Sequence, residues 1–236
     1  MYCGAAEFVC LPEAVKHVPV LVKECMGFLE PEGGGVFADL TFGGGGHSRE
    51  ILSANILNQL MAVDCDPDAS DRAQGLNGDF GDRFEFVDSK FQDFDKYAKS
   101  KAFDGILLDL GISSFQLMQA EKGFSFRLDA PVDMRLNPRE GISAAEFLEK
   151  ASLDSLVRAV REYGEERRWR KVVDAIVKAR GTGRLQRTLT AAEVVAEAVG
   201  GHRSRQRIHP ATKCSNLSET QITSLHKAIR HVCTVA

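Results

Sequence analysis

The sequence has 236 residues and six cysteines, but no two cysteines form a C-x-x-C pair. Cysteines scattered in this way argue against a disulfide framework or a zinc site, and they favour free thiols in a reducing cytoplasm. We therefore predict no metal site and a cytoplasmic location. Long apolar runs are also missing, as the short run Gly105–Leu108 illustrates, so no membrane-spanning helix is expected. Residues 1–18 lack the basic start and apolar core of a signal peptide.

A strong excess of one charge is missing from the chain as a whole. With 44% apolar residues, 27% charged residues and a net charge of −3, the composition is typical of a globular protein. The charge is nevertheless uneven, because residues 158–213 carry 14 Lys and Arg against 6 Asp and Glu. A basic segment in an acidic protein indicates a polyanionic partner, although a solvated helical face with paired charges would give the same pattern.

Short apolar segments alternate with helical patterns in the first half of the chain. Strands are predicted within 34–42, 59–67, 83–94 and 103–114. Strands that alternate with helices indicate an α/β fold with a parallel, doubly wound sheet. From residue 142 to about 200 every segment has a helical pattern, with Ser143 and Thr190 as expected N-caps and Gly164 and Gly181 as expected helix ends. This block predicts a helical subdomain inserted into the α/β fold.

The segment DLTFGGGGHS (39–48) places four glycines between a predicted strand and a predicted helix. Glycine allows positive φ angles and close approach of other atoms to the backbone. In this type of sheet, ligands bind at the carboxyl ends of the strands. Asp64 ends the second strand, where it can accept hydrogen bonds from both ribose hydroxyls of a nucleoside, and Asp109 ends the fourth strand at the same edge. The pattern therefore predicts a nucleoside-containing ligand.

The pattern alone does not decide whether that ligand is a dinucleotide or S-adenosylmethionine. A dinucleotide fingerprint requires glycine where Ser48 stands, and the pyrophosphate of a dinucleotide is poorly suited to Asp39, four residues before Gly43. The acid suits the amine or sulfonium of S-adenosylmethionine better. An NAD-dependent oxidoreductase remains an alternative with the same fold, but the sequence offers neither that glycine nor a proton-relay residue.

Seven motifs occur in one order along residues 17–212 and together resemble a known family. They are HVPVLVKECMGFL, DLTFGGGGHSREIL, AVDCDP, FDGILLDLGISSFQL, GFSFRLDAPVDMRLNP, EYGEERRWRKV and RIHPAT. The chain closely resembles the bacterial 16S rRNA cytosine-N4 methyltransferases. The resemblance implies a class I Rossmann-like, S-adenosylmethionine-dependent fold with a helical insert. It also implies methylation of the N4 amine of a cytidine in the decoding region of 16S rRNA within the small ribosomal subunit.

The resemblance also implies which residues contact the donor. They are Gly45, Gly46 and His47 in the loop, Asp64 at the ribose, Phe91 beside the adenine, and Asp109 and Gln116 as the last two contacts. Taken alone, the histidine could be an ordinary helix residue, the phenylalanine a core residue, the glutamine a surface residue, and the two acids turn or cap residues.

The expected reaction is an in-line transfer of a methyl group to the cytosine amine. Asp109 is the candidate catalytic residue, because an acceptor on the amine protons would localise the nitrogen lone pair. The helical insert is expected to hold the RNA, with Trp169 as either a core or a stacking residue. The candidate phosphate contacts are Arg167, Arg168, Arg170, Lys171, Arg203, Arg205 and Arg207.

The expected organisation is a donor-binding domain over 1–120, the helical insert over 121–208, and a return to the first domain over 209–236.

Two departures from the family pattern stand out. Phe115 occupies a position where the family has proline, which is expected to shift the loop that carries Gln116. The tail from Cys214 departs completely, and a shift of reading frame near Lys213 would explain it. We then expect the last strands of the sheet to be missing, and an inactive remnant that binds rRNA or nothing is the alternative to an active enzyme.

Overall fold

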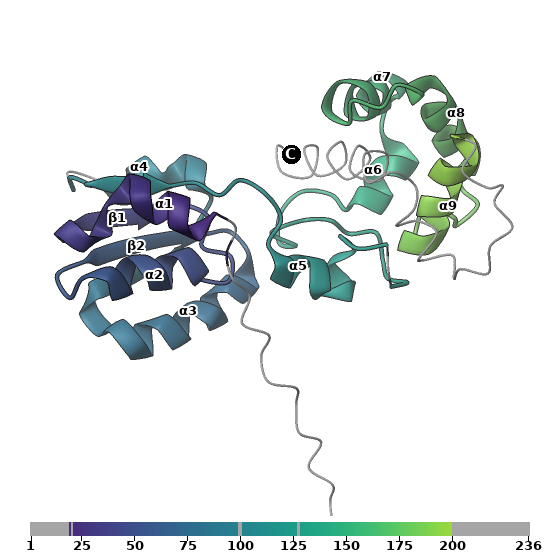
Figure 1. Ribbon diagram of the computed structural model, residues 1–236. Helices are drawn as coiled ribbons and strands as arrows, with labels where there is room; N and C mark the ends of the chain where they lie inside the picture. The colour runs from purple at the N-terminus through teal and green to yellow at the C-terminus, as the bar shows by residue number, and fades with distance from the viewer. Residues whose placement is uncertain (1–18, 20, 99–100, 127, 200–236) are drawn as a thin grey trace, which may run out of the picture.

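The computed structural model describes residues 19, 21–98, 101–126 and 128–199. A parallel sheet forms the first half of this part of the chain, and a group of helices forms the second half (Figure 1). Within the described residues, no helix is long and apolar enough to cross a membrane. The predicted segment 209–236 and the tail from Cys214 lie outside the described residues.

The sheet has the strand order β3-β2-β1-β4, and each neighbouring pair runs parallel. Its strands are β1 (Val36–Asp39), β2 (Gln59–Asp64), β3 (Phe84–Asp88) and β4 (Gly105–Leu107). Parallel neighbours require crossover connections, which helices supply along this chain. The predicted Rossmann-like α/β fold is therefore confirmed.

Helices cover both faces of the sheet. They are α1 (Val22–Leu29), α2 (Gly46–Ala54), α3 (Pro67–Phe80) and α4 (Phe94–Ala98). Successive strand residues point to opposite faces, so Leu60 and Ala62 join one core with residues of α1, α2 and α3. Met61 and Val63 join the other core, against which Phe94 of α4 packs. Short 3₁₀ turns complete this half at η1 (Pro31–Gly33), η2 (Gly81–Arg83) and η3 (Phe91–Asp93).

The second half has its own core of buried apolar side chains, drawn from residues 124–199. Figure 1 shows these helices to one side of the sheet, with α5 between the two halves. The elements are α5 (Ser114–Met118), η4 (Ala120–Lys122), α6 (Ala144–Lys150), α7 (Leu153–Val157), the π-helix η5 (Arg158–Tyr163), α8 (Trp169–Ala179) and α9 (Thr188–Ala198).

Three of the four predicted helix boundaries in this half are confirmed. Ser143 caps α6 by accepting the backbone N–H of Glu146, Gly164 follows η5, and Gly181 follows α8 with a φ of 70°. The prediction for Thr190 is wrong, because α9 already begins at Thr188. The buried Thr188 hydroxyl accepts the N–H of Ala130 and donates to the carbonyl of Leu128, so contacts with a distant loop start the helix earlier.

Candidate functional site

The glycine segment forms a loop between the end of β1 and the start of α2. Gly43 and Gly45 have φ angles of 52° and 75°, which other residues adopt only with strain. A Cβ atom on Gly44 would collide with the ring of Phe115, and one on Gly46 would collide with Pro19. Some of the close approach that the glycines allow is therefore used by the chain's own side chains.

Asp64 holds the first glycine of this loop, Gly43, through a hydrogen bond. Its Oδ2 accepts the N–H of Gly43 at 2.7 Å and its Oδ1 accepts the N–H of Asp66 at 2.9 Å. Burial raises the pKa of Asp64, while the two backbone donors oppose that shift. Each carboxylate oxygen has a second lone pair, so the side chain can still accept hydrogen bonds from a ligand at the strand edge.

Asp39, at the end of β1, lies inside the protein and not on the ligand side. The residue is only 1% exposed, its Oδ2 accepts the hydroxyl of Ser48 at 2.6 Å, and its Oδ1 accepts the N–H of Thr41. Burial raises the pKa of this carboxyl group. The expectation that Asp39 suits a positively charged ligand group therefore does not correspond to a direct contact. Ser48, which breaks the dinucleotide pattern, instead ties α2 to β1.

His47 and its neighbours form the first turn of α2. Gly45 is the N-cap and has no side chain to cap the helix, Gly46 is the first helical residue, and His47 is 6% exposed. The backbone amides of a first helical turn point out along the helix axis, where the helix dipole favours negative groups. The three predicted loop contacts, Gly45, Gly46 and His47, thus lie together at the start of α2, beside the carboxyl ends of the parallel strands.

Phe91 and Asp109 lie at the surface near the same edge. Phe91 belongs to η3, directly after β3, and is 43% exposed, so it is not a core residue. Asp109 follows β4 and is exposed, and its backbone N–H donates to the hydroxyl of Thr41 at 2.8 Å. An aromatic face and a carboxylate are therefore accessible on either side of the glycine loop.

Gln116 has a different environment from the one expected of a ligand contact. It is 4% exposed, its Oε1 accepts the N–H of Ser113 at 3.0 Å, and its Nε2 donates to Oδ2 of Asp66 at 3.0 Å. Ser113 in turn caps the same helix by accepting the N–H of Gln116. In this structure Oε1 of Gln116 helps to cap its own helix α5, and Nε2 joins that helix to the start of α3.

The residues around Asp66 were missed by the sequence reasoning. Asp66 is the N-cap of α3, its side chain is fully buried, and it forms ion pairs with Lys122 at 2.5 Å and Arg72 at 3.5 Å. Lys122 also pairs with Asp68, whose pKa it lowers. An acid directly before Pro67 is a recognisable helix-start signal, but its partner Lys122, 56 residues away in the chain, has no local signature.

The basic segment presents exposed cations around one aromatic ring. The exposed residues are Arg161, Arg167, Arg168, Arg170 and Lys171. Trp169 packs against the helical core, which is the first of its two predicted roles, while Arg161 and Arg170 lie over its ring at 5.4 and 4.4 Å from the centroid. Arg168 also donates to the carbonyl of Val199. The predicted contacts Arg203, Arg205 and Arg207 lie outside the described residues.

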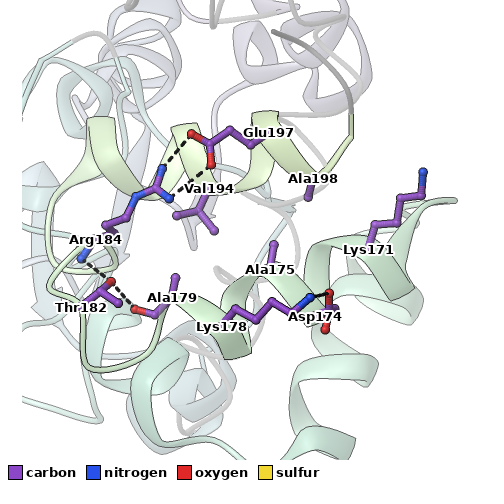
Figure 2. Close-up of a pocket in the computed structure, with 10 residues that line it drawn as sticks. All are labelled: Lys171, Asp174, Ala175, Lys178, Ala179, Thr182, Arg184, Val194, Glu197 and Ala198. Atoms are coloured by element: carbon purple, nitrogen blue, oxygen red, sulfur yellow. Dashed lines mark hydrogen bonds and ion pairs between the residues drawn. The ribbon is translucent and has the colours of Figure 1, made fainter.

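A cavity of about 460 Å³ lies between α8 and α9, far along the chain from the glycine loop (Figure 2). Most of the charged side chains around it form ion pairs. Lys178 pairs with Asp174 at 2.7 Å, and Nη1 and Nη2 of Arg184 both donate to the Glu197 carboxylate. None of the predicted donor-binding residues lines it. Among the described residues there is also no cluster of three or more His, Cys, Asp or Glu side chains that could hold a metal ion.

Comparison with known proteins adds a family relationship. The family model described as the MraW methylase family matches residues 14–216. Relatives named ribosomal RNA small subunit methyltransferase H include one from Parvibaculum lavamentivorans, which is 43% identical over 85% of this chain and 59% of the relative. The relative from Rickettsia massiliae is 41% identical over 84% of this chain and 63% of its own, and that from Cereibacter sphaeroides is 42% identical over 84% and 58%. The chain thus spans about three fifths of the length of these relatives.

Proposed function

The chain belongs to the MraW methylase family, and from that premise we propose that it binds S-adenosylmethionine at the carboxyl ends of its parallel strands. We further propose that it methylates the N4 amine of a cytidine in the decoding region of 16S rRNA, within the cytoplasmic small ribosomal subunit. The observation that carries the proposal is the position of the glycine loop, Asp64 and Phe91 along one strand edge.

The residues at this edge fit the parts of the donor. The free lone pairs of Asp64 suit the ribose hydroxyls, and the exposed ring of Phe91 suits the adenine. The uncapped start of α2 at Gly45, Gly46 and His47 suits the methionine carboxylate. Gln116 is proposed to act behind this site, where it holds α5 against Asp66.

When bound, S-adenosylmethionine supplies a methyl group activated by the adjacent sulfonium. In the proposed transfer the new N–C bond would form as the C–S bond breaks, the donor would leave as the neutral thioether S-adenosylhomocysteine, and the proton lost by the amine would pass to solvent. Asp109 is exposed at the end of β4, where its carboxylate can accept a hydrogen bond from the amine and localise the lone pair on nitrogen. This role predicts that Asp109→Asn lowers turnover more than it lowers donor affinity, and equal turnover with unchanged affinity would contradict it.

The exposed arginines of the helical half are proposed to hold the RNA backbone. Arg161 and Arg170 lie over the Trp169 ring, which also packs against the helical core, so the ring is proposed to support these two cations. We also propose the domain division near residue 120, which is supported by the fact that the core of residues 124–199 shares no buried residue with the two cores of the sheet.

The first experiment is a calorimetric titration of the folded 236-residue chain with S-adenosylmethionine, followed by a methylation assay on small subunits that lack this modification. Saturable one-site binding and transfer of label to the N4 position support both parts of the proposal. A folded chain that binds no donor would overturn the donor site, and donor binding without transfer would favour the inactive remnant.

A further inference from the structure

The glycine loop is held from two sides by residues that no ligand role accounts for. Arg72, on α3, donates its Nε proton to the carbonyl of Gly43 at 2.7 Å. The N–H of that same glycine is held by Asp64, so both polar groups of Gly43 are fixed. A loop residue with a positive φ that is bonded at both backbone groups has little freedom to change conformation.

Phe115 packs against the next residue of the loop, Gly44. Its ring occupies the space where a side chain on Gly44 would lie, and it also lies 5.4 Å from the Arg72 guanidinium. The guanidinium therefore donates to the loop carbonyl and also lies over the aromatic ring that packs against the next loop residue. Arginine suits such a site because its planar cation can donate and stack at the same time.

The Arg72 guanidinium is held in place by few contacts, and the ring of Phe115 is one of them. The Arg72 side chain is only 19% exposed, and its Nη2 atom finds no hydrogen-bond partner among the described residues, although Asp66 lies 3.5 Å away as a counter-charge. The hydrogen bond to Gly43 and the ion pair with Asp66 hold two nitrogens of the group, and the ring of Phe115 adds a third contact. Loss of the ring would remove that third contact and weaken the hold of the arginine on Gly43.

We propose that Arg72 and Phe115 are positioning residues for methyl transfer, which act together to hold the Gly43–Gly46 loop in its donor-binding conformation. This inference rests on the proposed function. It also gives a role to Phe115, which stands where the resembling family has proline. A proline ring is not aromatic, so it would offer no π face to Arg72.

The chain contains a matched control for this pair. Arg83 also stacks on a phenylalanine, with its guanidinium 5.3 Å from the Phe80 ring, and it also donates to backbone carbonyls, those of Leu52 and Asn55. These contacts lie at the other end of α2 from the glycine loop. Arg83→Gln and Phe80→Leu therefore remove the same chemistry without touching the proposed donor site.

The test compares Arg72→Gln, Arg72→Lys, Phe115→Leu and Phe115→Pro with the two controls. Donor dissociation constants come from calorimetry, melting temperatures are measured without donor, and hydrogen exchange reports the amides of residues 43–46. We expect Arg72→Gln to weaken donor binding about tenfold or more and to speed exchange of the loop amides. Arg72→Lys should recover only part of both effects, and each control should leave donor affinity within about twofold at a similar loss of melting temperature.

The two readouts separate the possible failures. Unchanged loop exchange in folded Arg72→Gln and Phe115→Leu would overturn the inference, whether or not the parent chain binds donor. A parent chain that binds no donor while both variants loosen the loop would overturn the proposed function, and it would support only the part of the inference in which Arg72 and Phe115 hold the loop. If Arg72→Gln does not fold, Phe115→Leu decides the question alone.

Discussion

At the scale of single residues, three carboxylates near the carboxyl ends of the strands are stabilised by three different sets of hydrogen-bond donors. Asp39, Asp64 and Asp66 are carboxylates removed from water, a change that costs free energy unless donors replace the water. Asp39 is satisfied by a hydroxyl and a backbone amide, Asp64 by two backbone amides, and Asp66 by the cations of Lys122 and Arg72. Only Asp64 combines this support with access to the ligand side.

The pH dependence of donor binding follows from that environment. Because burial raises the pKa of Asp64, the carboxylate is lost at a higher pH than an ordinary aspartate, whose pKa is about 3.9. In the proposed site the ionised form accepts both ribose hydroxyls, so donor affinity should fall as the pH is lowered, beginning at a higher pH than for an ordinary aspartate. Calorimetric titration from pH 8 down to about pH 4 checks this, with the exposed Asp79→Asn as a control that keeps the same profile. Affinity that stays constant until the pH reaches the ordinary pKa of an aspartate would contradict the assignment.

Cys65 follows Asp64 directly and should be an unreactive thiol. Burial, aided by the neighbouring charge of Asp64, raises its pKa to about 11. At pH 8 the thiolate fraction is then ~0.1%, roughly a hundredfold below that of a thiol with a pKa of 9. Alkylation with iodoacetamide, followed by peptide mass spectrometry, should therefore label Cys65 far more slowly in the folded chain than after denaturation. Equal rates would contradict the burial of this side chain.

At the scale of secondary-structure elements, helix caps offer the most direct test of the helical half. Ser143→Ala removes the hydroxyl that accepts the N–H of Glu146, which should lower the free energy of unfolding by about 1 kcal/mol. Ser53→Ala, on the exposed side of α2, is the matched control and should change it by less than about 0.5 kcal/mol. Urea denaturation of both variants measures the difference, and equal effects would remove the capping role.

Much of the fold could be predicted from local patterns, and the exceptions have a common physical cause. The alternation of strands and helices and the cap at Ser143 depend on neighbouring residues, so the sequence shows them directly. The start of α9 could not be predicted, because Thr188 is held by the loop at Leu128 and Ala130. Where a contact with a distant segment competes with local capping chemistry, the distant contact decides the boundary.

The candidate site also contains residues that could be predicted from local patterns and residues that could not. The glycine loop, Asp64 and Phe91 follow strands along the chain, so their common edge could be predicted from strand order alone. The burial of Gln116 could not, because its partner Asp66 lies 50 residues earlier. Arg72 was missed for the same reason, since a single arginine on a helix gives no sign that it bonds a glycine carbonyl 29 residues away.

At the scale of the whole molecule, the two halves differ in charge as well as in core. The basic segment begins at Arg158, within the helical half, whereas the rest of the chain has an excess of acids. This distribution separates the proposed donor site from the proposed RNA surface. An acidic half also repels the RNA backbone, so the basic surface would set the direction from which the RNA approaches.

RNA affinity should therefore depend on salt through the helical half. Each phosphate contact contributes to the slope of the logarithm of the binding constant against that of the salt concentration. Replacing exposed Arg167 and Arg170 with Gln should weaken binding of a decoding-region RNA and reduce this slope by about 1 to 2. Arg49→Gln, which breaks a surface pair with Asp79 on the sheet half, is the control. Filter binding between 50 and 300 mM salt checks the expectation, and an unchanged slope would contradict it.

The contacts of Arg72 and Asp66 also have a consequence for synthesis of the chain on the ribosome. The two cores of the sheet use only residues from Met26 to Phe103, so the sheet can assemble while later residues are still being translated. Phe115, Gln116 and Lys122 emerge afterwards, and only then can the ring close on Gly44 and the cation reach Asp66. We therefore expect the sheet to form before these later residues close the glycine loop.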